Sequence, residues 1–327
     1  MPLFMYRSDP PSSTSVLLYL FHYFLSFDGM EPLSAESFRR IVRSFLDEVD
    51  FHVHFEKPRQ NVLDQAYSTL QSLPHWQAGW NNYIVVSYEV VRLMVPHLCD
   101  DAQAQITIKY ALGLLIDDKP SLFVPGIQFS SGRLIQTDHV GYDYACAIFA
   151  AVDRLQEWYE PFIVSIIWKS WFQWMIFLPY ETQETASLAS VPSEHFINYT
   201  RHLTTVADST SCVVFNNGSD AKEFVQLIPD MTAFVIEIND FLSFYKESIV
   251  GNDCYNVIIQ RQRLHQETYE QVIQQSRDAC LEIMKRLCSA PVSARMRELV
   301  RQFVAGYVKF YLGVTRYRLK ELFSNKV

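Results

Sequence analysis

The stretch NDFLSFYKE, residues 239–247, carries three oxygen-bearing side chains at intervals of four residues. Asn239, Ser243 and Glu247 therefore project from one face of an α-helix. The row upstream on the same face consists of Phe224, Ile228, Thr232 and Val235. A capped or solvated helix end would explain the three polar residues as well as a binding site would, so the spacing by itself leaves both readings open.

The composition excludes several classes of protein. The chain has 327 residues, 49% of them hydrophobic and 14% aromatic, which is enough for a sizeable core in one large or two ordinary domains. Only 10 residues are glycine, and no P-loop, dinucleotide fingerprint or HExxH zinc helix occurs. The net charge of −8 argues against a nucleic-acid partner. An anionic ligand would therefore need metal cations to supply positive charge.

Cysteine usage and apolar runs predict a cytoplasmic protein without a membrane span. The 6 cysteines form no CxxC pair and show no zinc spacing, as expected in a reducing compartment. The apolar run at 16–27 is the one candidate for membrane insertion that we identify, and it is too short to cross a bilayer. We interpret it as a core helix that follows a disordered N-terminus over residues 1–15.

Helical periodicity dominates the chain from Ser34 onward. The first stripe consists of Phe38, Ile41, Val42, Phe45 and Leu46. Further helices are predicted over 60–73, 81–98, 102–118, 141–156, 158–177, 193–212, 220–248, 261–288 and 292–323, with prolines between them. No run alternates like a strand, and no linker or repeat divides the chain. We therefore expect one all-α domain over residues 16–327, with about ten helices.

A second polar cluster follows an apolar helix in KYALGLLIDDKPS, residues 109–121. Asp117 and Asp118 stand at the helix C-terminus, where acidic groups oppose the helix dipole. A divalent cation would offset that cost, because Mg²⁺ prefers carboxylate oxygens. Tyr110 lies two turns deeper on the face of Asp117. A solvated helix end is the simpler alternative for such a pair.

The third cluster lies in YLGVTRYRLKELF, residues 311–323. Arg316 continues an apolar row formed by Val304, Val308 and Leu312, and Tyr317 follows it. An arginine on such a row must extend to solvent or meet a buried anion. Arg201, in FINYTRHLTT at 196–205, is a further cation on a helix with few positive charges.

The three clusters together resemble the class I terpene synthases, and in particular the fungal sesquiterpene cyclases of the trichodiene synthase family. The likeness rests on FHVHFEKPRQNVL (51–63), YALGLLIDD (110–118), NDFLSFYKE (239–247) and GYVKFYLGVTRYRL (306–319). It spreads over residues 40–323 and is specific in the 239–247 stretch. The resemblance implies a single all-α domain whose helices surround a central apolar cavity.

The resemblance also implies a metal site. Asn239, Ser243 and Glu247 would chelate one Mg²⁺, and Asp117 would hold the other two ions of a three-ion cluster. The family pattern has a further acid three or four residues after the first aspartate, where this chain has Lys119, Pro120 and Ser121. Asp117 would therefore bear the bridging role alone.

Two details near Asp117 follow from the residues. Pro120 disfavours the helical conformation at Lys119, so Ser121 should point away from the metals. Asp118 would act behind the metal site, through a salt link to an arginine such as Arg316.

Other residues would bind the diphosphate and line the cavity, by the same resemblance. Arg201 would sense the diphosphate, although its distance from Asn239 in the sequence is shorter than the family's usual spacing. Lys246, Arg316 and Tyr317 would donate hydrogen bonds to the leaving diphosphate. Tyr110 would help to line the wall of the substrate cavity.

The expected function is Mg²⁺-dependent cyclisation of farnesyl diphosphate to a sesquiterpene. A prenyl-chain-elongating synthase is disfavoured, because that family has a second aspartate-rich motif where this chain has its Asn-Ser-Glu set. A catalytically inactive helical scaffold stays open because the DDKPS stretch (117–121) is altered. His52, His54 and Glu56 have the composition of a metal cluster, but we interpret them as structural. The sequence leaves a homodimer open and does not identify the product.

Overall fold

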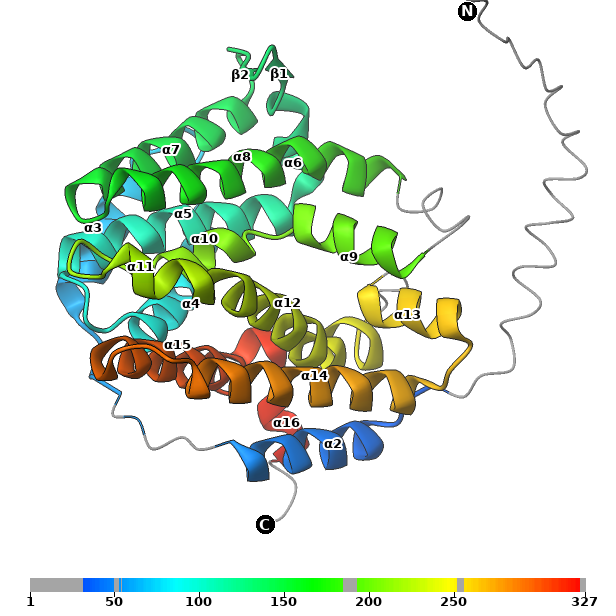
Figure 1. The fold of residues 1–327 in the computed structure, drawn as a ribbon. Coiled ribbons are helices and arrows are strands. Elements are labelled where there is room, and N and C mark those ends of the chain that lie inside the picture. The colour runs from blue at the N-terminus through cyan, green and yellow to red at the C-terminus, as the bar shows by residue number, and fades with distance from the viewer. Residues whose placement is uncertain (1–31, 50–52, 54, 185–192, 252–255, 324–327) are drawn as a thin grey trace, which may run out of the picture.

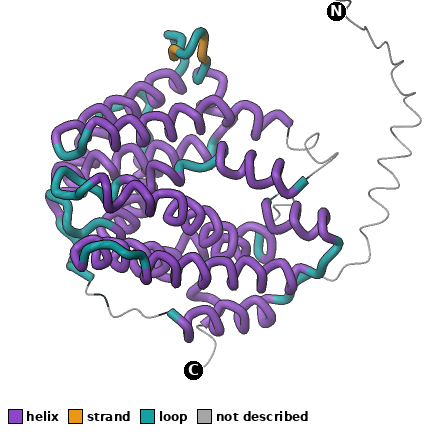
Figure 2. Tube along the Cα trace, in the orientation of Figure 1, coloured by secondary structure: helices purple, strands orange, loops and turns teal. Residues whose placement is uncertain are grey.

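The computed structural model describes residues 32–49, 53, 55–184, 193–251 and 256–323 (Figure 1). Helices make up nearly all of this part of the chain and stack in layers (Figure 2). The prediction of an all-α fold is confirmed. The predicted helix at 16–27 and the predicted disorder at 1–15 lie outside the described residues, so the domain boundary stays a prediction.

The helices of the described residues fall into a longer and a shorter group. The longer ones are α2 (Ala35–Glu48), α3 (Gln60–Gln71), α4 (Asn81–Met94), α5 (Asp100–Asp118), α7 (Val140–Arg154), α8 (Pro161–Glu184), α9 (Glu194–Leu203), α12 (Ile228–Phe244), α13 (Val257–His265), α14 (Tyr269–Ser289) and α15 (Ala294–Gly313). The shorter ones are α6 (Pro120–Phe123), α10 (Ala207–Cys212), α11 (Ala221–Phe224) and α16 (Leu319–Phe323). Strands β1 (Phe129–Ser130) and β2 (Arg133–Leu134) form a small antiparallel hairpin that the sequence pattern does not predict.

The stripe predicted on the first helix is the buried face of α2. Ser34 caps this helix, because its side chain accepts a hydrogen bond from the backbone N–H of Ser37. Phe38 is fully buried and its ring lies 6.0 Å from that of Phe241. Helix α2 packs against α14 at the lower edge of the molecule in Figure 1. The contact between Phe38 and Phe241 places this first described helix against the segment that carries Asn239 and Glu247.

Helix α5 runs through the centre of the domain and is buried on almost every side. It packs against α3, α4 and α7. Polar side chains such as Gln103, Thr107 and Lys109 are buried along it together with the apolar ones. A helix that is enclosed all round has no solvent face, so each polar group on α5 needs a partner inside the protein.

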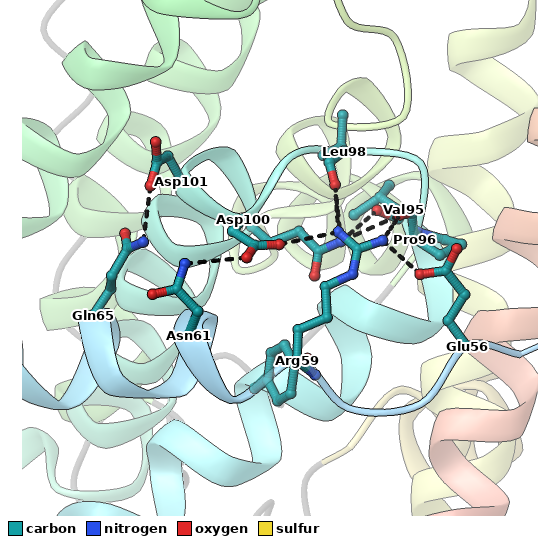
Figure 3. A network of polar contacts seen from close by, with 11 residues as sticks. Glu56, Arg59, Asn61, Gln65, Val95, Pro96, Leu98, Asp100 and Asp101 are labelled. Atoms are coloured by element: carbon teal, nitrogen blue, oxygen red, sulfur yellow. Dashed lines mark hydrogen bonds and ion pairs between the residues drawn. The ribbon is translucent and has the colours of Figure 1, made fainter.

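The turn between α4 and α5 is held by Arg59 (Figure 3). Its guanidinium donates hydrogen bonds to the carbonyl oxygens of Pro96 at 2.7 Å and Leu98 at 2.8 Å. It also binds Glu56 at 2.5 Å. These bonds satisfy carbonyl groups beyond the end of α4 that have no partner within a helix. Glu56 thus contacts Arg59, whereas His52 and His54 lie outside the described residues, so the interpretation of the three as structural stays a prediction.

The second half of the domain is more interrupted than the periodicity predicts. The single helix expected over 193–212 is two helices, α9 and α10, which are separated at 204–206. The helix expected over 261–288 is also two, because Gln266 adopts a left-handed conformation with φ 54° and ends α13. Thr268 then caps α14 in a capping box with Gln271.

Helix α15 ends at Gly313 instead of continuing to 323. Val314 is extended, Thr315–Tyr317 forms a short 3₁₀ turn (η7), and Arg318 is left-handed with φ 60°. The prediction that Arg316 continues the helical row of α15 is therefore wrong. The extended Val314 ends the helix two residues before Arg316, so the side chain of Arg316 no longer follows the row of α15.

Helix α8 continues through Pro179, which the sequence pattern places between helices. Residues Pro161–Pro179 of this helix are long and apolar enough to cross a membrane, by length and composition only. In the fold, 44% of that window is buried. The expectation that 16–27 is the only such stretch is therefore corrected.

Candidate active site

One cavity of about 390 Å³ lies between α4, α5, α8, α9, α10, α12 and α15. It brings together most of the residues singled out in the sequence, although they come from distant parts of the chain. Those that line it are Tyr110, Asp117, Arg201, Asn239, Lys246, Glu247, Arg316 and Tyr317. Ser243 and Asp118 are not among its lining residues.

The acidic pair ends α5 where the sequence predicts. Lys119 leaves the helical conformation, with φ −134° and ψ 51°, and Pro120 begins the separate helix α6. Ser121 is exposed on that helix. The prediction that the helix stops at this proline is confirmed.

Asp117 lies in an unfavourable environment for a negative charge. Water reaches its side chain through the mouth of the cavity. Protein atoms nevertheless surround the carboxyl group, and this burial, together with the negative charge of Asp118, raises the pKa of Asp117. Arg316 and Lys246 oppose the shift. A carboxylate placed in this way would gain from a nearby cation.

Asp118 and Arg316 form a two-pronged ion pair across 198 residues of sequence, with N–O distances of 2.5 and 2.7 Å. Burial opposes ionisation of Asp118, but the hydrogen bonds and charge of Arg316 lower the pKa of its carboxyl group. Tyr83 lies beside the same carboxylate and acts in the same direction. The predicted salt link between Asp118 and Arg316 is thus confirmed. The contribution of Tyr83 to the pKa of Asp118 was not predicted.

The Asn-Ser-Glu set spans the junction between α12 and a π-helical turn, η6 (Tyr245–Ile249). The sequence predicts an unbroken α-helix here, and the π turn is a correction; such turns are frequent at functional sites. Asn239 donates a hydrogen bond to the hydroxyl oxygen of Tyr311 at 2.7 Å. Ser243 is 1% exposed, and its hydroxyl has no hydrogen-bond partner among the described residues. Glu247 forms an ion pair with Lys246 at 3.4 Å.

Arg201 reaches from α9 to the start of this set. It donates a hydrogen bond to the amide oxygen of Asn239 at 2.5 Å and forms an ion pair with Asp240 at 2.6 Å. Burial raises the pKa of Asp240 to about 6 against the opposing charge of Arg201. Sequence reasoning missed Asp240, although it stands second in the NDFLSFYKE stretch.

Aromatic rings form much of the wall. Tyr317 lies 4.3 Å from Tyr311 and 5.4 Å from Phe310, measured between ring centroids. Tyr110 donates a hydrogen bond to Thr210 at 3.1 Å. The sequence analysis missed several further wall residues, namely Trp171, Trp174, Tyr307, Phe310 and Tyr311. The four-residue spacing of Tyr307 and Tyr311 on α15 is the one signal that could have indicated the last two tyrosines.

No group of three or more His, Cys, Asp or Glu side chains within the described ranges could hold a metal ion. Any metal site in this cavity must therefore mix oxygen types. Among the oxygen-bearing groups that line it are the amide of Asn239 and the carboxylates of Asp117, Asp240 and Glu247, while the hydroxyl of Ser243 is buried outside the lining.

The fold is similar to those of solved terpene synthases. A cucumene synthase variant has a TM-score of 0.52 and 14% identity, covering 83% of this chain and 100% of that chain. A linalool/nerolidol synthase from Streptomyces clavuligerus has a TM-score of 0.50 and 11% identity, covering 80% of this chain and 99% of that chain. The architecture is therefore that of the terpene synthases.

The sequence comparisons identify the family within this class. The trichodiene synthase family model matches residues 53–327. An (E)-beta farnesene synthase of Metarhizium brunneum is 24% identical over 306 residues, 89% of this chain and 92% of the relative. A longiborneol synthase of Gibberella zeae is 24% identical over 325 residues, 91% of each chain. The chain belongs to the trichodiene synthase family and is an enzyme of the terpene synthase type.

Proposed function

We propose that the protein is a sesquiterpene synthase that ionises and cyclises farnesyl diphosphate with Mg²⁺ and releases diphosphate. One observation carries the proposal: the same cavity is lined by ionic groups, among them Asp117, Arg201 and Arg316, and by aromatic rings. A prenyl diphosphate has the same two halves, an anionic head and an apolar chain. The linalool/nerolidol synthase of similar fold was solved with 2-fluorogeranyl diphosphate, a ligand of this chemical class.

The oxygen-bearing residues fit a magnesium site. Asn239, Ser243 and Glu247 would hold one ion and Asp117 the other two of a three-ion cluster. The buried hydroxyl of Ser243 has no partner among the described residues, and Asp117 has a raised pKa, so both groups would gain from a cation. When bound, the metal ions would neutralise charge on the diphosphate and favour its departure.

The cationic residues would bind the diphosphate head. Arg316, Lys246 and Arg201 line the cavity beside Asp117. As the allylic C–O bond breaks, its electron pair leaves with the diphosphate. Donors already in place around that group stabilise the charge that develops on it. The hydroxyl of Tyr317 would add one more hydrogen bond, and Asp118 would hold Arg316 in position.

The aromatic wall would guide the carbocation. Ring faces attract cations, and a closed apolar wall keeps water from the reactive carbon. Tyr311 and Tyr317, whose hydroxyl groups lie among other rings, are kept neutral because burial raises the pKa of each. Neutral rings retain this attraction without presenting a phenolate oxygen that could bond to the carbocation.

Two other functions remain as alternatives. A chain-elongating synthase would need a second aspartate-rich motif, and this chain has Asn239 and Ser243 in its place. An inactive scaffold would be consistent with the altered stretch after Asp118, since Ser121 is exposed on another helix. Membership of the trichodiene synthase family favours the cyclase over both. The cytoplasmic location and the homodimer stay predictions.

The proposal is tested by incubating the purified full-length protein with Mg²⁺ and farnesyl diphosphate and analysing the extract by gas chromatography and mass spectrometry. Parallel reactions contain geranyl diphosphate, or farnesyl diphosphate with isopentenyl diphosphate. We expect a sesquiterpene and inorganic diphosphate from both reactions that contain farnesyl diphosphate, and no sesquiterpene from geranyl diphosphate. A longer prenyl diphosphate in the third reaction would identify an elongating synthase. Binding without turnover in every reaction would identify a scaffold.

A further inference from the structure

Lys109 is buried in the middle of α5 behind the wall of the cavity. Its side chain has no exposed surface. Among the described residues its amine lies 4.2 Å from the Tyr110 ring centroid and 5.4 Å from that of Trp171, and no carboxylate forms an ion pair with it. Burial lowers its pKa well below the usual lysine value. A buried amine without an acidic partner is costly, and a methionine of similar length would fill the space without that cost. The amine is therefore expected to have a task.

Among the described residues, the amine of Lys109 donates to one hydrogen-bond acceptor, the hydroxyl oxygen of Ser209 at 2.8 Å. The same oxygen accepts a hydrogen bond from the indole N–H of Trp171 at 3.1 Å. A hydroxyl oxygen has two lone pairs, so these two donors fill its accepting capacity. The backbone N–H of Ser209 is held in turn by the side chain of Ser170 at 3.2 Å. Ser209 thus joins α5, α8 and α10 at one point.

Trp171 forms part of the cavity wall and lies against α5. A Cβ atom built on Gly113 would come within 2.6 Å of the indole ring, so the ring occupies the space that this glycine leaves. Tyr110 and Trp174 flank it, with ring centroids at 6.1 and 5.5 Å. These contacts enclose the ring, and the hydrogen bond to Ser209 fixes the rotation of its plane.

We propose that Lys109 is a positioning residue that, through Ser209, fixes the plane of the Trp171 ring and thereby selects among the products of the enzyme. This inference rests on the proposed terpene synthase function. A carbocation is stabilised over the face of a ring and much less at its edge. A small rotation of Trp171 would therefore change which carbon of the folded chain is stabilised. Lys109 itself lines no part of the cavity and touches no substrate.

The central experiment uses Lys109→Met, which removes the donor and keeps the length and apolar stem of the side chain. We expect the ratio of major to minor products to change by about threefold or more, because competing pathways respond to small differences in barrier. The KM for farnesyl diphosphate should stay near that of the wild type, since the ionic mouth is untouched. The control is Lys309→Met on exposed α15 surface, which should leave the ratio unchanged.

A double-mutant cycle decides whether Lys109 acts through Trp171. Trp171→Phe keeps an aromatic ring but removes the indole donor. If the proposal holds, adding Lys109→Met to Trp171→Phe should change the product ratio little further. The proposal would be overturned if Lys109→Met changed the product ratio equally in the wild type and in Trp171→Phe. It would also be overturned if Lys109→Met lowered the melting temperature and left the product ratio unchanged. If Lys109→Met fails to fold, Ser209→Ala removes the shared acceptor and takes its place in the cycle.

A second readout does not depend on turnover. The emission of Trp171 is obtained by subtracting the spectrum of Trp171→Phe from that of the wild type, and likewise in the Lys109→Met background. The amine of Lys109 lies 5.4 Å from the Trp171 ring centroid, so a shift that Ser209→Ala also produces would support the positioning role. A shift confined to Lys109→Met, or identical spectra, would contradict it. If the wild type makes no terpene, the proposed function fails while this comparison still tests the contact.

Discussion

Arg201 donates a hydrogen bond at 2.5 Å to the amide oxygen of Asn239, the atom that would bind Mg²⁺ in the proposed site. The guanidinium and the metal ion therefore compete for one oxygen. Asp240 holds Arg201 in the same place by an ion pair at 2.6 Å. A diphosphate that draws Arg201 toward the cavity would free this oxygen, so substrate binding and metal binding at Asn239 are expected to be coupled.

The first prediction follows from this contact. Arg201→Met should raise the affinity for Mg²⁺ without diphosphate by about tenfold, because a hydrogen bond from a charged group no longer occupies Asn239. The same change should lower kcat/KM for farnesyl diphosphate. Isothermal titration with Mg²⁺ alone measures the first effect, with Arg39→Met on the surface of α2 as control. Unchanged or weaker Mg²⁺ binding would show that Arg201 does not compete with the metal.

The second prediction is an asymmetry between the two aspartates at the end of α5. Asp117→Ala should lower kcat by about 1,000-fold or more, because two metal ions would lose their common ligand. Asp118→Asn should cost about 10- to 100-fold, because it removes a charged partner from Arg316 but no metal ligand. Steady-state kinetics at saturating Mg²⁺ compares the two. Equal losses would mean that Asp118 also binds metal.

The third prediction concerns Ser243. Because its buried hydroxyl has no partner among the described residues, Ser243→Ala should leave the melting temperature of the metal-free protein nearly unchanged. It should raise the Mg²⁺ concentration needed for half-maximal turnover and lower turnover at limiting Mg²⁺. Normal turnover at limiting Mg²⁺ would remove Ser243 from the metal site. EDTA should abolish the activity of the wild type.

The fourth prediction concerns Arg316. Arg316→Lys should reduce activity and broaden the product profile, because a point charge cannot reproduce the two parallel bonds to Asp118. Gas chromatography should detect more hydroxylated products, since a loosely closed site admits water. An unchanged rate and profile would mean that only the charge at this position matters.

The fifth prediction concerns the acid that the DDKPS stretch lacks. Ser121→Asp should change Mg²⁺ affinity little, because Ser121 is exposed on a helix that begins anew at Pro120. Titration of the variant with Mg²⁺ measures this directly. A strong gain in affinity would show that the segment rearranges to bring the new carboxylate to Asp117.

Much of the fold follows from local patterns in the sequence. Ser34 caps α2 as its position predicts, and Pro120 ends α5 because of a steric effect on the preceding residue. The left-handed turn at Gln266 was not foreseen, because glutamine carries no preference for that conformation. The π turn that holds Glu247 was missed for the same reason, since no glycine or proline marks it. Local signals thus predict helices better than they predict their interruptions.

The site was predictable where charge or motif revealed it. Opposite charge made the pair of Asp118 and Arg316 foreseeable despite their separation in the sequence. Trp171 was not, because in the sequence it is one of 6 tryptophans and only the fold brings it to Gly113 and Ser209. A wall residue is defined by its neighbours in space, and no spacing along the chain encodes them.

The hydrogen bonds of Arg59 hold not only the turn before α5 but also the first residue of that helix. Asp100, its first residue, is held by Arg59 at 3.3 Å and Asn61 at 3.1 Å. Its last residues, Asp117 and Asp118, stand about 27 Å away at the usual helical rise. The two ends of the helix are therefore held by different parts of the chain, Asp100 by Arg59 and Asn61 and Asp118 by Arg316. A diphosphate that draws Arg316 away from Asp118 would release only the acidic end, so closure would move that end while the end at Asp100 stays still.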